Sequence, residues 1–172
     1  MAAIKMTYLF CYDDHRSFTE DIRKRFSDSS RYTVTSFHTQ QEFKDHCRAQ
    51  TDNNFCKVAI IGVPDAKEQF EMIEKMTMEI KRYDQKTGLV LLVPADKMDD
   101  FKKVVMFNID AYIPKNANSV LRIHNVVKKL ISEHSMAINK KRRNFSLWVL
   151  LVFLGLSAIL VLFAFIKLPE YF

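Results

Sequence analysis

Glycine is scarce in this chain: Gly62, Gly88 and Gly155 are the only glycines among 172 residues. A dinucleotide-binding fingerprint needs three clustered glycines, a phosphate-binding P-loop needs at least two, and a hydrolase nucleophile elbow needs two around its serine. None of these spacings occurs here. The sequence therefore excludes the glycine-dependent nucleotide sites and the serine-hydrolase elbow.

Cysteine is also scarce, and Cys11, Cys47 and Cys56 form no C-x-x-C pair. Their odd number cannot close a disulfide framework, which predicts a reducing compartment for the first 144 residues. Cys47 and Cys56, taken together with His38 and His46, fit no zinc-ligand spacing. The N-terminal apolar stretch is short and soon followed by charged residues, so no signal peptide is expected.

Positive charge is in excess, but only locally. The chain carries a formal charge of +6 and has a pI of about 9.2. Residues 1–127 hold 19 basic and 18 acidic side chains, whereas residues 128–144 hold six basic side chains and one acidic. No strand or helix interleaves aromatic and basic residues as a nucleic-acid surface does. We therefore expect no nucleic-acid partner.

Residues 145–166 contain no charged side chain. A helix of this length covers about 33 Å, enough for a hydrocarbon core of about 30 Å, and the segment is apolar all round rather than on one side. It predicts a transmembrane helix, and no glycine or proline stops the preceding helix before it. Asn139 and Asn144 leave a break between the two helices open.

Basic residues flank the apolar segment on its N-terminal side. Only Lys167 follows the segment, so the positive-inside rule predicts a single-pass, tail-anchored protein at the cytoplasmic (inner) membrane with its N-terminal domain in the cytoplasm. The expected parts are a domain at 1–135, a basic juxtamembrane segment at 136–144, the membrane helix at 145–166 and an external tail at 167–172. The residues that set this topology are Lys140, Lys141, Arg142 and Arg143.

The first 135 residues alternate short apolar runs with helical patterns. The runs predict strands at 7–12, 32–37, 58–63, 89–93 and 111–113. The spacing of apolar residues predicts helices at 17–26, 40–49, 67–83, 97–107 and from Ser119, interpreted as an N-cap. Such alternation is typical of an α/β fold with a five-stranded, parallel, doubly wound, flavodoxin-like sheet. Right-handed crossovers favour the strand order 2-1-3-4-5.

Functional residues of such a sheet lie where the strands end. The residues at those ends are Asp13, Asp14, Gly62, Val93 and Lys115. Segments 9–14, 58–64 and 110–115 resemble a receiver domain of bacterial two-component response regulators, of the chemotaxis-regulator type, and the similarity covers about residues 5–135.

The resemblance implies a role for each position. In that family an acid pair holds Mg²⁺, an aspartate ending strand three accepts a phosphoryl group, a hydroxyl ending strand four binds its oxygen, and a lysine neutralises it. By position, Asp13 and Asp14 match the acid pair, Lys115 matches the lysine, and Tyr112 matches the aromatic residue associated with switching. Two simpler roles stay open: the aspartates could equally serve only as ion-pair partners of Lys115, and Tyr112 as a packed strand residue.

The departures from the family pattern are more informative. Gly62 stands in place of the phosphoacceptor aspartate, Val93 in place of the hydroxyl, and Asn116 in place of the proline after the lysine. Glycine cannot form an aspartyl phosphate, and Mg²⁺ binds poorly to two carboxylates alone. The sequence therefore predicts a degenerate receiver without enzymatic activity or a cofactor, with Asp13 and Asp14 as weak Mg²⁺ candidates.

The leading functional hypothesis is a membrane-anchored, phosphorylation-independent pseudo-receiver that acts as a signalling adaptor or scaffold. Its protein partner would dock at the cytoplasmic membrane face, and homodimerisation stays open. The residues expected on the docking face are Phe101, Val105, Phe107 and Tyr112.

Two other hypotheses stay open. The chain is alternatively a structural subunit of a secretion or motility complex, with Gly155, Ser157 and Ala158 at helix contacts. A third hypothesis is a receiver phosphorylated at a non-standard residue, for which Asp65, three residues after Gly62, is the candidate.

Overall fold

The computed structural model describes residues 6–167, apart from 14–15, 51–54 and 106–107. The chain divides into two compact units, Met1–Ile131 and Ser132–Phe172. The first unit contains every strand and the shorter helical segments. The described residues of the second unit, 132–167, are the continuation of the last helix.

Five parallel strands form one sheet in the order β2-β1-β3-β4-β5. This confirms the predicted fold class and strand order. The central strands β3 and β4 are buried at every position, because helices cover both of their faces, whereas β2 at one edge is half-buried throughout. The strands are β1 (Thr7–Tyr12), β2 (Tyr32–Phe37), β3 (Cys56–Gly62), β4 (Gly88–Pro94) and β5 (Ala111–Lys115).

The helices follow the predicted positions with small differences at their ends. They are α1 (Arg16–Arg25), α2 (Gln40–Ala49), η1 (Lys67–Gln69), α3 (Phe70–Tyr83), η2 (Ala95–Lys97), α4 (Met98–Val104) and α5 (Ser119–Lys167). Helix α4 ends at Val104, where the sequence predicted helix to 107. Ser119 is the first residue of α5 rather than the residue before it.

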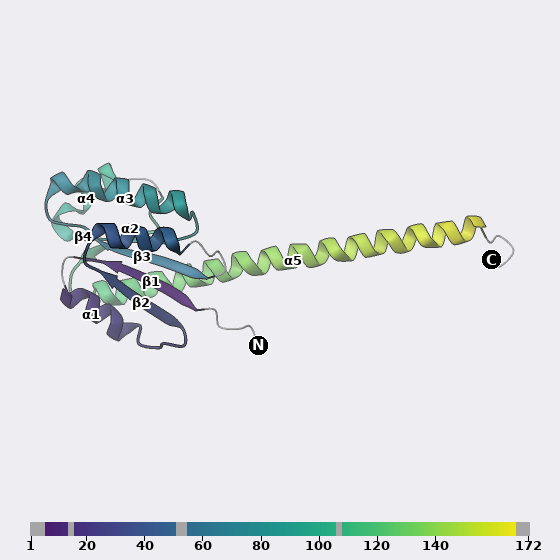
Figure 1. Cartoon of the computed structure of the whole chain (residues 1–172), viewed down its shortest axis with the longest axis horizontal. Coiled ribbons are helices and arrows are strands. Elements are labelled where there is room, and N and C mark those ends of the chain that lie inside the picture. Colours follow the sequence, from purple (N-terminus) through teal and green to yellow (C-terminus); the bar gives the residue numbers. More distant parts are fainter. Residues whose placement is uncertain (1–5, 14–15, 51–54, 106–107, 168–172) are drawn as a thin grey trace. The chain divides into compact units, whose positions relative to one another are not determined.

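Two apolar layers hold the helices against the sheet, as the strand alternation requires. Helices α2, α3 and α4 cover one face, and α1 with the first part of α5 covers the other (Figure 1). The first layer is built around Phe10, Phe43, Ile61, Ile73, Met76, Leu91 and Phe101. The second is built around Leu9, Ile22, Phe26, Val58, Ile60, Leu92, Ile113, Ile123 and Val127.

Helix α5 leaves the first unit at the amino edge of the sheet. Gly88 is the first residue of β4, and a Cβ atom there would lie 2.7 Å from Cδ1 of Leu130. Because glycine has no Cβ atom, Leu130 is able to pack against the backbone of Gly88 at this edge. The chain passes into the second unit one residue later, after Ile131.

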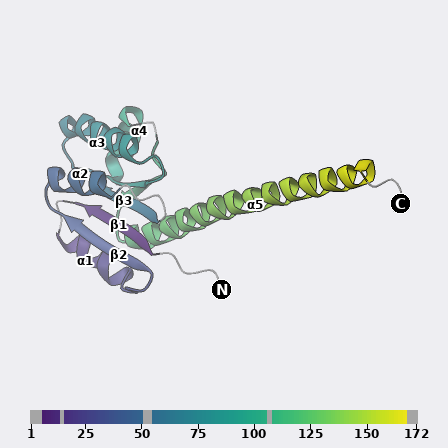
Figure 2. The same cartoon turned by 45° about the vertical axis from the view of Figure 1, so that its right-hand side comes forward.

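Residues Ser119–Lys167 form one helix, drawn as a single ribbon in Figure 2. The break left open at Asn139 and Asn144 does not occur. By length and composition this helix is able to cross a membrane. Its large apolar side chains from Phe145 to Leu162 are exposed in the structure, and none of the most apolar window is buried. An exposed apolar helix of this kind is consistent with a membrane anchor.

A buried ion pair joins β3 to the end of α3. Lys57 and Asp84 are both buried and form an ion pair, and Lys57 Nζ also donates to the backbone oxygen of Gln50 over 2.8 Å. Asp84 accepts further hydrogen bonds from the Lys86 N–H and the Thr87 hydroxyl. Burial by itself would raise the pKa of Asp84, but these hydrogen bonds and the Lys57 charge outweigh it and hold the pKa below its usual value.

We expect Asp84→Asn to lower the free energy of unfolding by about 3–5 kcal/mol, because it leaves the Lys57 charge buried and unpaired. A carboxyl with a lowered folded-state pKa stabilises above its unfolded pKa of about 3.9, and this contribution disappears as the pH falls through the folded value. The deficit should therefore be complete at neutral pH and shrink below about pH 4. This loss is measured by urea unfolding of the full chain in non-ionic micelles, with hydrogen exchange of the strand amides as the signal for unfolding.

Asp100→Asn is the control, since it removes an exposed pair with Lys67. It should cost only a small fraction of the Asp84→Asn loss. Equal losses for the two variants at neutral pH would contradict the importance of the buried pair.

Candidate functional site

Three residues from different strands meet at the carboxyl edge of the sheet. Asp13 directly follows β1, Gly62 ends β3 and Lys115 ends β5. Lys115 Nζ lies 3.6 Å from Asp13 Oδ2, and its side chain is 28% exposed, whereas the Asp13 side chain is 3% exposed. The edge thus presents a half-buried ammonium group beside a buried carboxylate.

The Asp13 carboxylate occupies the space in which a side chain at position 62 would begin. A Cβ atom built on Gly62 would lie 1.9 Å from Asp13 Oδ2, 2.5 Å from Cγ and 3.0 Å from Cβ. Real Cβ atoms essentially never approach other atoms this closely. Any residue larger than glycine at this position therefore requires Asp13 to move. This exclusion is a property of the folded site that the sequence did not reveal.

The loop after Lys115 is held by Ser119. The Ser119 hydroxyl accepts from the Asn116 N–H over 2.7 Å and lies 2.6 Å from the Asn116 carbonyl oxygen and 2.9 Å from that of Pro114. The Asn116 side chain accepts from the Asn118 N–H over 3.0 Å. These contacts fix the backbone on which Lys115 stands, and they give Ser119 a different role from the predicted helix cap.

Strand β4 ends one residue later than the sequence predicted. Val93 is fully buried in the layer under α2, α3 and α4, and Pro94, the last strand residue, pairs with Lys115 in the sheet register. The position that ends strand four is therefore Pro94 rather than Val93. Neither side chain carries a hydroxyl, so this end of β4 offers no side-chain donor to a phosphoryl oxygen.

The second member of the acid pair, Asp14, lies outside the described residues. Within the described part of the chain, no three histidine, cysteine, aspartate or glutamate side chains gather as a metal site would require. Asp13 is the member of the predicted pair that the structure places, and it forms an ion pair with Lys115. A magnesium role for the acid pair stays a prediction.

The predicted docking face contains both buried and accessible residues. Phe101 and Val105 are buried, and Phe107 lies outside the described residues. The Tyr112 hydroxyl donates to the Val105 carbonyl just after α4, and its ring contacts Phe101 edge-on at 6.4 Å. Lys102 Nζ lies 5.8 Å from the centre of the same ring, and burial raises the pKa of the phenol. Tyr112 thus links β5 to α4.

The alternative phosphoacceptor Asp65 lies in the loop after β3, where it is exposed. Its backbone carbonyl accepts a hydrogen bond from Lys97, just before α4. A role for the Asp65 carboxylate in phosphoryl transfer stays a prediction.

The basic residues Lys140, Lys141, Arg142 and Arg143 all lie exposed on α5, in the second unit. They directly precede its apolar part.

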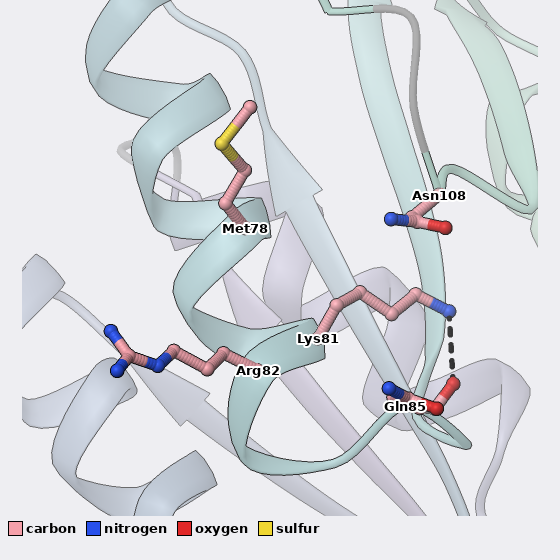
Figure 3. A pocket seen from close by; sticks show the side chains of 5 residues that line it. All are labelled: Met78, Lys81, Arg82, Gln85 and Asn108. Atoms are coloured by element: carbon pink, nitrogen blue, oxygen red, sulfur yellow. Dashed lines mark hydrogen bonds between the residues drawn. The ribbon is translucent and has the colours of Figure 1, made fainter.

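A pocket of about 500 Å³, which sequence reasoning missed, lies at the opposite, amino edge of the sheet. Lys81 extends from α3 toward Asn108 and the Gln85 carbonyl, while Arg82 points the other way (Figure 3). Lys81 Nζ also lies 3.2 Å from Asp110, whose carboxylate accepts from the Leu89 N–H. Only the basic pair in the last turn of α3 signals this pocket in the sequence.

The three cysteines are all buried and free. Burial raises the pKa of Cys11 and of Cys47 to about 12, and that of Cys56 to about 11. A thiol with such a pKa stays protonated near neutral pH and is a poor nucleophile or metal ligand. We therefore assign no nucleophilic or metal-binding role to the three cysteines.

Solved structures share the fold of the first unit at low sequence identity. A response regulator receiver domain protein from Clostridium thermocellum matches with a TM-score of 0.61 and 13% identity, over 77% of this chain and 99% of its own. An adenylate cyclase from Rhodopirellula baltica matches with a TM-score of 0.59 and 14% identity, over 78% and 94%. The response regulator TrrA from Thermotoga maritima, in complex with Mg²⁺ and BeF, matches with a TM-score of 0.53 and 17% identity, over 73% and 99%.

These likenesses establish a receiver fold, followed in this chain by a long apolar helix. No protein-family model and no curated protein matches the chain. At such low identities the likeness shows the fold alone, so the chemistry of the site has to be argued from its own residues.

We expect Gly62→Ala to lower the free energy of unfolding by about 1–3 kcal/mol, because the new Cβ atom displaces a buried carboxylate from its ion pair. In an Asp13→Ala background the same substitution should cost much less. A double-mutant cycle from urea unfolding of the full chain in micelles measures this coupling. An equal cost of Gly62→Ala in both backgrounds would contradict the steric exclusion.

Proposed function

We propose that this chain is a membrane-anchored pseudo-receiver. Its receiver-like domain acts without phosphorylation and without enzymatic activity, as a signalling adaptor or scaffold that docks a partner protein at the cytoplasmic face of the membrane. The observation that best supports this proposal is that the Asp13 carboxylate fills the space in which a side chain at position 62 would begin.

The geometry of the carboxyl edge opposes phosphoryl transfer in two ways. Position 62 has no carboxylate, and the space next to it holds the Asp13 carboxylate beside Lys115. A phosphoryl group bound there would have to displace an anion from its ion pair. The Asp13 carboxylate already neutralises the Lys115 ammonium group, which is what a bound phosphoryl group would otherwise do. The ion pair therefore favours a single conformation of this edge rather than a switch between two conformations.

The hydrogen bond of Tyr112 supports the same interpretation. Its hydroxyl is bound to the Val105 carbonyl, and its ring contacts Phe101 and Lys102. Releasing the ring would break this hydrogen bond and the packing at the end of α4. A tyrosine held in this way favours a fixed α4–β5 surface.

The anchor in this proposal is the apolar part of α5. The large apolar side chains from Phe145 to Leu162 point to all sides of the helix and are exposed, and exposed basic residues at 140–143 precede them. The positive-inside rule then assigns the receiver-like domain to the cytoplasm. Such an anchor keeps an adaptor at the membrane, where the local concentration of membrane-bound partners is high.

The docking surface in this proposal is the accessible part of the α4–β5–α5 edge. Val104 on α4 is 39% exposed and Leu121 in the first turn of α5 is 51% exposed, although both are large apolar residues. Tyr112 is half-buried on the strand between these helices. A partner would contact these residues, while Phe101 and Val105 support them from below.

Incubation of the full chain with acetyl phosphate and Mg²⁺ should give no phosphoryl adduct by intact mass. Gly62→Asp should not take up a phosphoryl group either, because its Cβ atom forces the Asp13 carboxylate out of its ion pair with Lys115 and so disrupts the edge at which the group would bind. A single adduct on the unmodified chain that is lost in Asp65→Asn would overturn the proposal in favour of the non-standard receiver.

Val104→Glu combined with Leu121→Glu should abolish recovery of the partner in pull-down from native membranes, because a charged side chain in an apolar contact is left without a partner. Met78→Glu is the matched control, since Met78 is similarly exposed but lies on α3. It should leave recovery unchanged.

The stoichiometry of the recovered material separates the adaptor from the structural subunit. A substoichiometric partner that the double variant loses supports docking at this edge. A fixed-ratio complex in mild detergent that survives the double variant would support assembly through α5 instead.

A further inference from the structure

The helices α1 to α4 all end in basic side chains, and they all end at the same edge of the sheet. In a parallel sheet each connecting helix begins at the carboxyl edge and returns to the amino edge, so these four helices terminate together there. The basic residues in their last turns are Arg23, Lys24 and Arg25, then Arg48, then Lys81 and Arg82, then Lys102 and Lys103.

Acidic residues gather toward the other edge. The first turns of α2, α3 and α4 carry Glu42, Glu71, and Asp99 with Asp100. This distribution complements the partial charges of the helix ends, which are positive at the N-terminus and negative at the C-terminus. The domain is therefore nearly neutral in total but strongly polarised, with its positive side at the amino edge.

The same edge is the one from which α5 departs. Leu130 packs against Gly88 at the start of β4, and the neighbouring Lys128 and Lys129 are exposed on α5. The chain from residue 132 to residue 144 covers at most about 20 Å as a helix. The polarity of the domain and the attachment of the membrane segment thus share one side of the sheet.

The amino edge also carries the features of an interfacial surface besides its charge. Tyr83 is 40% exposed at the end of α3, and the Arg48 guanidinium lies 5.6 Å from the centre of its ring. The pocket lined by Lys81, Arg82 and Gln85 lies at the same edge, with the exposed Met78 at its wall. Tyrosine and basic side chains around a polar pocket suit a layer of phosphate headgroups.

Some of this charge is already shared within the domain. Lys24 and Lys103 have exposed acidic partners at i−3, at 4.0 Å and 3.8 Å. Lys81 is paired with Asp110. Arg82 and Lys86 are exposed at the end of α3 and just beyond it. These two residues are therefore the clearest probes of the surface.

We propose that the amino edge of the receiver-like domain is a docking surface for the anionic headgroups of the membrane into which α5 inserts. This inference rests on the proposed anchoring by α5 and adds a second contact to it. The basic residues Arg48, Arg82 and Lys86 face lipid phosphates. Leu121, in the first turn of α5 at the carboxyl edge, stays accessible to a protein partner. Each basic residue near an anionic surface strengthens such a contact about fivefold.

The test uses the full chain in nanodiscs with a fluorophore on one introduced cysteine. The native cysteines are buried, so a label reports only the new position. Gln85→Cys places the label at the amino edge, and Ala117→Cys, in the exposed loop after β5, is the matched control at the carboxyl edge. A quencher attached to lipid headgroups then reports which edge lies on the bilayer.

In nanodiscs of equal phosphatidylcholine and phosphatidylglycerol we expect at least a roughly twofold greater quenching at position 85 than at position 117. The difference should disappear in pure phosphatidylcholine, and also at about 0.5 M salt, where the Debye length falls to about 4 Å. Arg82→Glu with Lys86→Glu should abolish it. Lys75→Glu with Arg122→Glu makes the same charge change away from this edge and should preserve it.

Equal quenching at the two positions in the anionic nanodiscs would overturn the docking surface while leaving the anchor intact. Quenching at position 85 that persists in pure phosphatidylcholine and after the charge reversal at Arg82 and Lys86 would also overturn it. Failure of the chain to copurify with any nanodisc would instead refute the anchoring by α5, and this inference with it.

Discussion

The buried carboxylate of Asp13, held against Gly62 and paired with Lys115, is the constraint on which the functional interpretation of this protein depends. A carboxylate in a buried place must be paired, and its partner Lys115 stands at the end of β5. Because the carboxylate lies where a side chain at position 62 would begin, the site tolerates no larger residue there without rearrangement. The ion pair joins the ends of β1 and β5, and its carboxylate fills the space beside Gly62 in which a receiver of the resembled family would carry its acceptor.

The parallel arrangement of the strands explains the rest of the functional layout. It gathers all strand ends, and with them Asp13, Gly62 and Lys115, at one edge, and the C-termini of α1 to α4 at the other. The carboxyl edge therefore concentrates the residues of the candidate site. The amino edge concentrates basic side chains, the pocket beside Lys81, and the point where α5 leaves the domain. The domain therefore has two chemically different edges, with the candidate site at one edge and basic side chains and the exit of α5 at the other.

Much of the fold was predictable because its signals are local. The runs at 7–12 and 32–37 coincide with β1 and β2, and the helix at 40–49 coincides with α2, since strong apolar periodicity defines short elements well. Errors concentrate at element ends, where backbone hydrogen bonds decide: β4 continues through Pro94, and α4 stops at Val104. Ser119 was interpreted as a cap, but its hydroxyl binds the loop at Asn116 instead. The sequence carried almost no indication of the pocket beside Lys81. Its residues lie in two separate parts of the chain and come together only because α3 and the segment before β5 both reach the amino edge of the sheet.

By itself the sequence determined the succession of strands and helices along the chain, the absence of a carboxylate at position 62 and the presence of one long apolar helix, because each of these follows from residue type or periodicity along the chain. Only the tertiary structure decided what fills the space beside Gly62, since that depends on the approach of two strands whose residues are 49 positions apart in the chain (62 less 13). It also decided that Phe101 and Val105 are buried while Val104 is exposed. Finally, it decided that basic helix ends scattered through the sequence lie together, because only the parallel sheet brings these ends to one edge.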